Sequence, residues 1–154
     1  MRAIRLEQQG GPEELKLVEL PDPVAGQGPL RGILTALDTA ITPLVIITTV
    51  DMPEILPEHL LWLANTMNAA PAAPFGLLLQ RPGPPTRIEP FPSIFHRTAA
   101  TLIRARLDAG LLSVQSLADT GEFIAIPSPP NWPERVWTNL NRMDDVLQWE
   151  KDSR

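Results

Sequence analysis

Alternating strand-like and helix-like segments in the first half of the chain predict an α/β fold with a mostly parallel sheet. Residues 43–50 (PLVIITTV) form a near-continuous apolar run rich in β-branched residues, which is typical of a strand buried on both faces of such a sheet. The 18 prolines punctuate the chain with short connections. Right-handed crossovers are expected, and one of the later, more closely spaced strands is expected to run antiparallel at an edge.

The other elements follow from periodicity and from helix start and stop signals. Pro29 after Gly28 opens a helix over residues 29–39, because proline is favoured at the first helical position. Gly110 ends a helix expected over residues 98–109. Helices are also expected over residues 56–67, 114–118 and 143–150, and strands over residues 1–6, 14–20, 75–79, 86–91 and 122–126.

Length and composition limit the possible functions. The 154 residues suit one domain, residues 1–154, with a buried core. A formal net charge of -5 argues against a nucleic-acid-binding surface. Without cysteine there are no disulfides or thiolate metal sites, and the two histidines are too far apart to form a zinc site. No signal peptide or membrane-spanning run is present, so we expect a cytoplasmic protein without membrane contact.

A candidate ligand site lies within residues 22–53. Gly26 and Gly28 allow a tight turn that brings the backbone close to a ligand, and the helix after them offers free N–H groups to an anion. Asp51 follows the strand of residues 43–50, at the end where open α/β sheets bind ligands. The alternative roles are a helix N-cap for Asp51 and simple turning or close packing for the glycines.

Four short motifs follow one another along residues 22–148. The first, D-P-V-A-G-Q-G-P-L-R-G-I, leads through a helix and a strand to D-M-P at residues 51–53. The others are I-E-P-F at residues 88–91, L-D-A-G at residues 107–110 and N-L-N-R-M-D-D at residues 139–145. In this order they resemble the molybdenum cofactor guanylyltransferase family of MobA-like nucleotidyltransferases. The resemblance implies a three-layer, Rossmann-like nucleotide-diphospho-sugar transferase fold.

The resemblance also implies a reaction, the transfer of GMP from GTP to a molybdopterin-type acceptor. Asp51 would hold a Mg²⁺ ion that bridges phosphates, since Mg²⁺ keeps several waters and needs few protein ligands. The residues implied for nucleotide binding are Asp22, Gly28, Gly32, Asn139 and Asn141. Turn formation is the alternative role for Asp22, and turn formation or capping of the last helix is the alternative for the two asparagines.

The sequence departs from the family at its N-terminal end. The family's loop of the kind L-A-G-G-x-S-x-R-M-G-x-D-K, which wraps the triphosphate, does not occur here, and the only lysines are Lys16 and Lys151. These departures predict an N-terminally truncated domain whose phosphate loop comes from another segment or chain. The alternative is a non-catalytic nucleotide-binding or partner domain of the same fold. Because a sheet without its first strand has an unprotected edge, a homodimer is expected.

Overall fold

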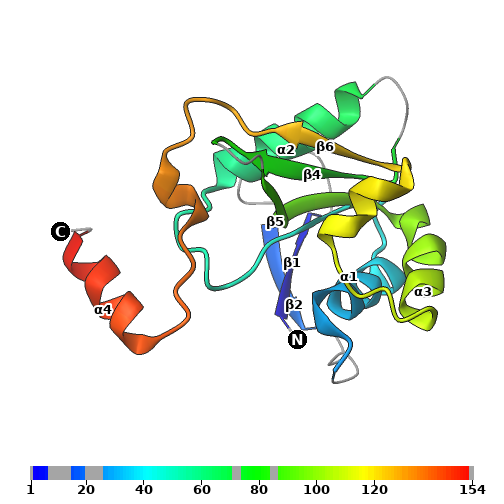
Figure 1. Ribbon diagram of the computed structural model, residues 1–154, viewed down its shortest axis with the longest axis horizontal. Helices are drawn as coiled ribbons and strands as arrows, with labels where there is room; N and C mark the ends of the chain where they lie inside the picture. The colour runs from blue at the N-terminus through cyan, green and yellow to red at the C-terminus, as the bar shows by residue number, and fades with distance from the viewer. Residues whose placement is uncertain (1, 7–14, 20–25, 71–73, 84–86, 153–154) are drawn as a thin grey trace.

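The computed structural model describes residues 2–6, 15–19, 26–70, 74–83 and 87–152 (Figure 1). Its helices are α1 (Gly28–Thr39), α2 (Pro57–Ala69), α3 (Ala100–Asp108) and α4 (Met143–Asp152), with 3-10 helices η2 (Arg97–Ala99), η3 (Gln115–Thr120) and η4 (Glu134–Trp137). Its strands are β1 (Arg2–Leu6), β2 (Leu15–Glu19), β3 (Leu44–Ile47), β4 (Gly76–Arg81), β5 (Arg87–His96) and β6 (Phe123–Pro127). Each helix and strand expected from the sequence has a counterpart among these elements. Within these ranges, no helix combines the length and the apolar character needed to cross a membrane.

Four strands form one sheet in the order β3-β5-β4-β6, and β1 pairs with β2 in a separate antiparallel hairpin. β5 is antiparallel to both β3 and β4, whereas β4 and β6 are parallel. β3, β4 and β6 therefore run in one direction and β5 runs against them. The α/β class is confirmed, but the antiparallel strand lies inside the sheet rather than at an edge. The short connection between β4 and β5 is the reason, because it joins two antiparallel neighbours as a hairpin.

Helices cover both faces of this sheet. α1 and α3 lie on one face, and α2 lies on the other (Figure 1). Side chains alternate accordingly along β4: Leu78 packs on the α1–α3 side, whereas Leu77 and Leu79 pack on the α2 side. This follows from the pleat, because successive strand side chains point to opposite faces. The expected three-layer arrangement is confirmed.

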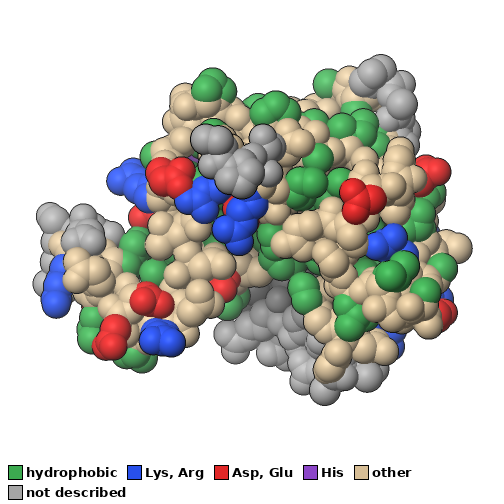
Figure 2. Space-filling view, viewed as in Figure 1, with side chains coloured by type: hydrophobic (Ala, Val, Ile, Leu, Met, Phe, Trp, Pro, Cys, Tyr) green, Lys and Arg blue, Asp and Glu red, His purple; other side chains and the backbone are tan. Residues whose placement is uncertain are grey.

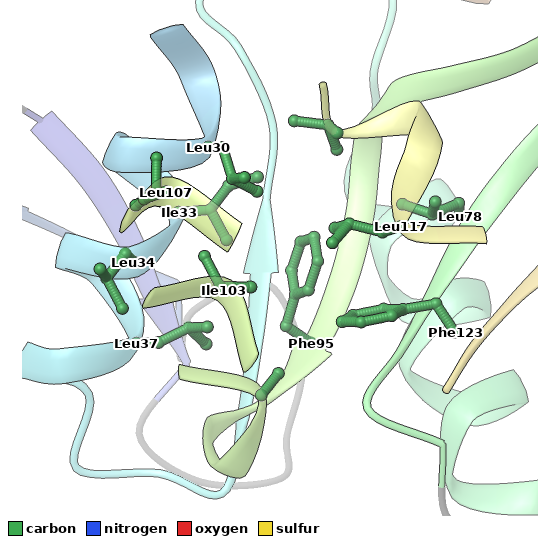
Figure 3. Close-up of a cluster of buried hydrophobic side chains, with 12 residues drawn as sticks. Leu30, Ile33, Leu34, Leu37, Leu78, Phe95, Ile103, Leu107, Leu117 and Phe123 are labelled. Carbon is green, nitrogen blue, oxygen red and sulfur yellow. The ribbon is translucent and has the colours of Figure 1, made fainter. Parts of the chain in front are cut away.

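A cluster of buried side chains fills the α1–α3 side of the sheet (Figure 3). Its α1 members form one helical stripe, namely Leu30, Ile33, Leu34 and Leu37. Phe95 of β5 is fully buried and lies between Ile103 of α3 and Phe123 of β6 (Figure 3). The rings of Phe95 and Phe123 meet edge to face, with centroids 6.0 Å apart. These contacts fix the helices against the sheet.

β3 differs from the strand expected over residues 43–50. It is shorter, and all of its residues are only half-buried, because β3 lies at an edge of the four-stranded sheet. β1, from the separate hairpin, contacts it. The central strands are the ones buried on both faces: Leu77, Leu78 and Leu79 of β4 are at most 1% exposed, and Ile94 and Phe95 of β5 are fully buried. The expected homodimer stays a prediction.

Candidate functional site

The candidate site lies at the edge of the sheet where β3, β4 and β6 end. These strands run in the same direction, so their carboxyl ends lie together. α1 connects to β3 through residues 40–43 and runs back along it, so the first turn of α1 lies toward the same edge. Ligands of open α/β sheets bind at this edge. The segment after β3, residues 48–56, therefore lies where a ligand is expected.

Asp51 lies in a turn of this segment, beyond the end of β3 at Ile47. Its carboxylate atom Oδ1 is buried and has no hydrogen-bond partner within the described part of the chain. The alternative role as a helix N-cap is wrong, because the N-cap of α2 is Leu56. A buried polar atom without a partner calls for an explanation, and a bound cation is one that suits a carboxylate.

The two candidate asparagines lie next to Asp51. The backbone N–H of Leu140 donates to the carbonyl oxygen of Asp51 at 2.8 Å, and Leu140 is the residue between Asn139 and Asn141. Both asparagines are exposed. The fold thus brings together two motifs that are far apart in the sequence. Asp145, in the first turn of α4, stabilises the start of this helix, since its Oδ2 accepts from the backbone N–H of Asn141 at 3.0 Å.

The candidate glycines differ in whether their backbone conformation requires glycine. Gly26 and Gly28 have φ angles of 83° and 61°, which lie in the left-handed region that favours glycine. A Cβ atom on either would meet nothing within 4 Å, so backbone conformation rather than space requires glycine there. Gly32 lies in α1 and is half-buried. Asp22 lies outside the described residues, so its role stays a prediction.

Three further residues at this edge were not predicted from the sequence. Gln27, the N-cap of α1, makes no side-chain cap hydrogen bond, and its Oε1 is buried without a described partner. Two hydroxyl oxygens are likewise buried without a described partner: Oγ1 of Thr48, directly after β3, and Oγ of Ser93, which is paired in register with Ile47. The only sequence signal that could have indicated such residues was a polar side chain within an apolar, strand-like run. These atoms are further oxygen ligands or acceptors that a ligand at this edge of the sheet could use.

A sequence model of the MobA-like NTP transferase domain matches residues 5–121, more than half of the chain. The chain belongs to this family. A molybdenum cofactor guanylyltransferase of Syntrophotalea carbinolica (strain DSM 2380 / NBRC 103641 / GraBd1) is 30% identical in an alignment 144 residues long, which covers 90% of this chain and 65% of that relative. The chain therefore spans just under two thirds of the length of this relative.

Two solved structures share the fold of this MobA-like domain. Molybdopterin-guanine dinucleotide biosynthesis protein A from Archaeoglobus fulgidus has a TM-score of 0.62 and 19% identity, and covers 80% of this chain and 62% of its own. A protein from Aquifex aeolicus VF5 has a TM-score of 0.59 and 16% identity, and covers 73% of this chain and 56% of its own. The resemblance inferred from the four motifs is confirmed at the level of family and fold.

The candidate oxygen atoms of the MobA-like domain fit a Mg²⁺ site only if a bound substrate supplies further oxygen ligands to the metal. Among the described residues, no group of three or more His, Cys, Asp or Glu side chains could hold a metal ion by itself. Mg²⁺ prefers oxygen ligands, keeps several waters and is commonly bound by one or two carboxylates together with substrate phosphates. Asp51 Oδ1 supplies one such oxygen. The donor set therefore suits a metal–nucleotide complex rather than a metal cage.

Two arginines near this edge, Arg81 and Arg135, are engaged by carboxylates. Arg81 forms an ion pair with Glu134 and lies 3.8 Å from Glu89, while Arg135 Nε lies 3.3 Å from Glu54. Figure 2 shows this mixture of basic and acidic side chains on one face of the molecule. Because Arg81 and Arg135 are paired in this way, we expect these two arginines to organise the surface of the MobA-like domain rather than to grip a triphosphate.

His59 stabilises the beginning of α2 in its neutral form. Its Nδ1 accepts from the backbone N–H of Leu56 at 3.0 Å, and the backbone N–H of His59 donates to the carbonyl oxygen of Leu56, also at 3.0 Å. Burial lowers the pKa of His59 from its ordinary value of 6.5, and the neighbouring Glu58 opposes this by raising the pKa. Protonation at Nδ1 would remove the acceptor that the Leu56 N–H uses.

This arrangement predicts a loss of stability on acidification. Below pH 6.5 the unfolded chain binds a proton at His59 that the folded chain does not, so the free energy of unfolding falls between pH 6.5 and the lower folded pKa. His59→Gln keeps an acceptor for the Leu56 N–H and does not titrate. Urea unfolding at pH 7.5, 6.5 and 5.5 is expected to show a shallower pH slope for His59→Gln than for the parent, whereas His96→Gln keeps the contribution of His59. Equal slopes for the parent and His59→Gln would contradict the prediction.

Proposed function

We propose that this MobA-like domain takes part in the Mg²⁺-dependent transfer of GMP from GTP to a molybdopterin-type acceptor. The relative from Syntrophotalea carbinolica is named a molybdenum cofactor guanylyltransferase, which supports this reaction class. The observation that carries the proposal is the buried Oδ1 of Asp51, which has no hydrogen-bond partner among the described residues and lies next to the N-L-N segment. A cytoplasmic location is part of the same proposal.

In the proposed reaction, a terminal phosphate oxygen of the acceptor attacks the α-phosphorus of GTP. The bond from that phosphorus to the oxygen bridging the α- and β-phosphates breaks, and pyrophosphate leaves. Such a transfer depends on positioning and charge neutralisation rather than on covalent help from the protein. Asp51 would hold Mg²⁺, which supplies positive charge to the phosphates when bound. The turn at Gly26 and Gly28 and the N–H groups of α1 would bind phosphate oxygens, and Asn139 and Asn141 would orient the substrates.

Calorimetry with GTP tests this proposal. The 154-residue chain is expected to bind GTP in the presence of MgCl₂ and to lose most of this affinity in EDTA, because the metal links Asp51 to the phosphates. Release of pyrophosphate from GTP is then measured with a molybdopterin-containing acceptor. Mg²⁺-dependent binding without pyrophosphate release would favour the non-catalytic nucleotide-binding alternative. Absence of GTP binding at millimolar concentration would overturn both.

A further inference from the structure

α4 is a helix that carries apolar side chains on its outer surface. It lies apart from the sheet and from the other helices (Figure 1), and Trp149 Nε1 ties it to the rest of the molecule by donating to Glu54 at 2.8 Å. None of its described side chains is buried: Met143 is 71% exposed and Leu147 is 49% exposed. A helix of 10 residues is only marginally stable in water unless an apolar face packs against a partner. Within the described part of the molecule, α4 lacks this packing.

The two faces of α4 differ in what they meet. Gln148 and Trp149 line a cavity of about 870 Å³ between α4 and the segment after β3, whereas Met143 and Leu147 do not line it. Met143 and Leu147 are four residues apart, so they lie on one stripe of the helix, one turn from each other. This stripe is therefore turned toward the solvent, and Figure 2 shows apolar side chains at the surface over α4.

Charged residues flank this stripe in an order that suits a second copy of the same helix. Asp144 lies in the first turn of α4 and Lys151 in the last turn, and both are exposed. Seven residues, or about two turns, separate them, so both lie on the same flank of the stripe. When two copies of α4 lie side by side in opposite directions, a two-fold axis brings Asp144 of each copy next to Lys151 of the other. Leu147, about midway between them, then meets its counterpart at the centre.

We propose that α4 binds α4 of a second copy of this chain as an antiparallel pair around a two-fold axis. Met143 and Leu147 form the apolar contact, and Asp144 and Lys151 form two reciprocal ion pairs. The opposite directions also place the positive end of each helix dipole beside the negative end of the other. Because the stripe is short and ends at Glu150, the contact area is small, and the dimer is a weak one that forms at high protein concentration.

This interface is independent of the sheet and of the proposed function. It uses no strand, so it differs from pairing at a free sheet edge. Met143, Leu147 and Lys151 have no role in the proposed binding of GTP or of Mg²⁺. Dimerisation through α4 and Mg²⁺-dependent binding of GTP can therefore succeed or fail separately.

Sedimentation equilibrium of the 154-residue chain tests the proposal. From micromolar to millimolar concentration, the apparent mass is expected to rise from 17.0 kDa toward twice this value. Leu147→Glu places a carboxylate from each copy at the centre of the contact, so it is expected to remove the rise. A parent chain that stays monomeric at millimolar concentration, or a dimer that persists in Leu147→Glu, would overturn the proposal.

Leu112→Glu is the matched control. Leu112 is also an exposed leucine, but it follows α3, which lies on the other side of the molecule from α4 (Figure 1). Leu112→Glu adds the same negative charge as Leu147→Glu and is expected to associate like the parent. An equal loss of association in both variants would show a nonspecific effect of charge or of apolar surface, and would overturn the proposal.

Charge reversal tests the pairing itself. Asp144→Lys and Lys151→Asp each turn both ion pairs of the dimer into repulsive contacts, so each variant is expected to associate about tenfold more weakly than the parent. An equimolar mixture of the two variants restores two pairs of opposite charge in a heterodimer and is expected to associate like the parent. Recovery on mixing cannot come from better folding, because neither chain is altered by it. A mixture that associates as weakly as the separate variants would overturn the antiparallel arrangement and the proposal with it.

Discussion

Asp51→Asn is expected to lower Mg²⁺-dependent affinity for GTP by at least about 100-fold, because even changes in the shell around a metal ligand cost about 10–100-fold. The same variant is expected to leave the free energy of unfolding without Mg²⁺ unchanged or raised. Oδ1 of Asp51 is buried without a described partner, and a buried charged oxygen without a partner is costly in the ligand-free protein. Calorimetry and urea unfolding measure the two effects.

Asp38→Asn is the matched control for this prediction. Asp38 is an exposed carboxylate late in α1, whose oxygens lie 2.8 and 2.9 Å from Nη2 of Arg104. An exposed ion pair of this kind contributes about 0–1 kcal/mol, so a small loss of stability and no change in Mg²⁺-dependent affinity are expected. If Asp51→Asn instead lost more than about 1 kcal/mol of stability and kept its affinity for Mg²⁺ and GTP, Asp51 would be a purely structural residue.

The local features of the fold could be predicted because their signals are local. Gly110 was expected to end a helix, and α3 ends at Asp108 with Gly110 at a φ of 73°, the left-handed conformation common after a helix. Pro29 marks the beginning of α1 in the same way. Such residues act through their own backbone, so the sequence indicates them directly.

The position of each strand in the sheet depends on distant partners. An apolar run looks the same in a central strand and in an edge strand, so the run of residues 43–50 could not distinguish the two. β3 became an edge strand because β5 inserts between it and β4, with Leu44 opposite His96. The central strand β4, which is buried on both faces, has leucines rather than β-branched residues.

The candidate site likewise combines features that the sequence indicates locally with features that depend on distant contacts. Asp51 and the N-L-N segment could be selected individually from turn chemistry and from the family resemblance. Their contact through Leu140 and the buried state of Oδ1 depend on how the chain folds back on itself. Ser93 is a polar residue among apolar ones, a signal too weak to select it, because a lone serine in a strand usually has a local backbone partner.

The largest loss of stability from a small change is expected for Gly76→Ala. Gly76 begins β4, paired with β5 on one side and with β6 on the other. A Cβ atom there would lie 2.6 Å from the carbonyl oxygen of Ile94 and 3.0 Å from Cδ1 of Phe123. Because the oxygen belongs to the backbone of a paired strand, it cannot turn away as a side chain can. We expect a loss of about 3 kcal/mol, at the upper end for overpacking, which lowers Tm by roughly 6–12 °C at this chain length.

Two further variants identify the cause of this loss. Gly121→Ala introduces a Cβ atom into open space but at a φ of 76°, so it is expected to cost only about 1 kcal/mol of backbone strain. Adding Phe123→Ala to Gly76→Ala removes the ring contact and leaves the contact with the Ile94 carbonyl oxygen. We therefore expect no recovery of Tm in the double variant, measured by thermal unfolding. Recovery toward the Phe123→Ala value would show that the ring, rather than the close approach of β4 to β5, requires glycine at this position.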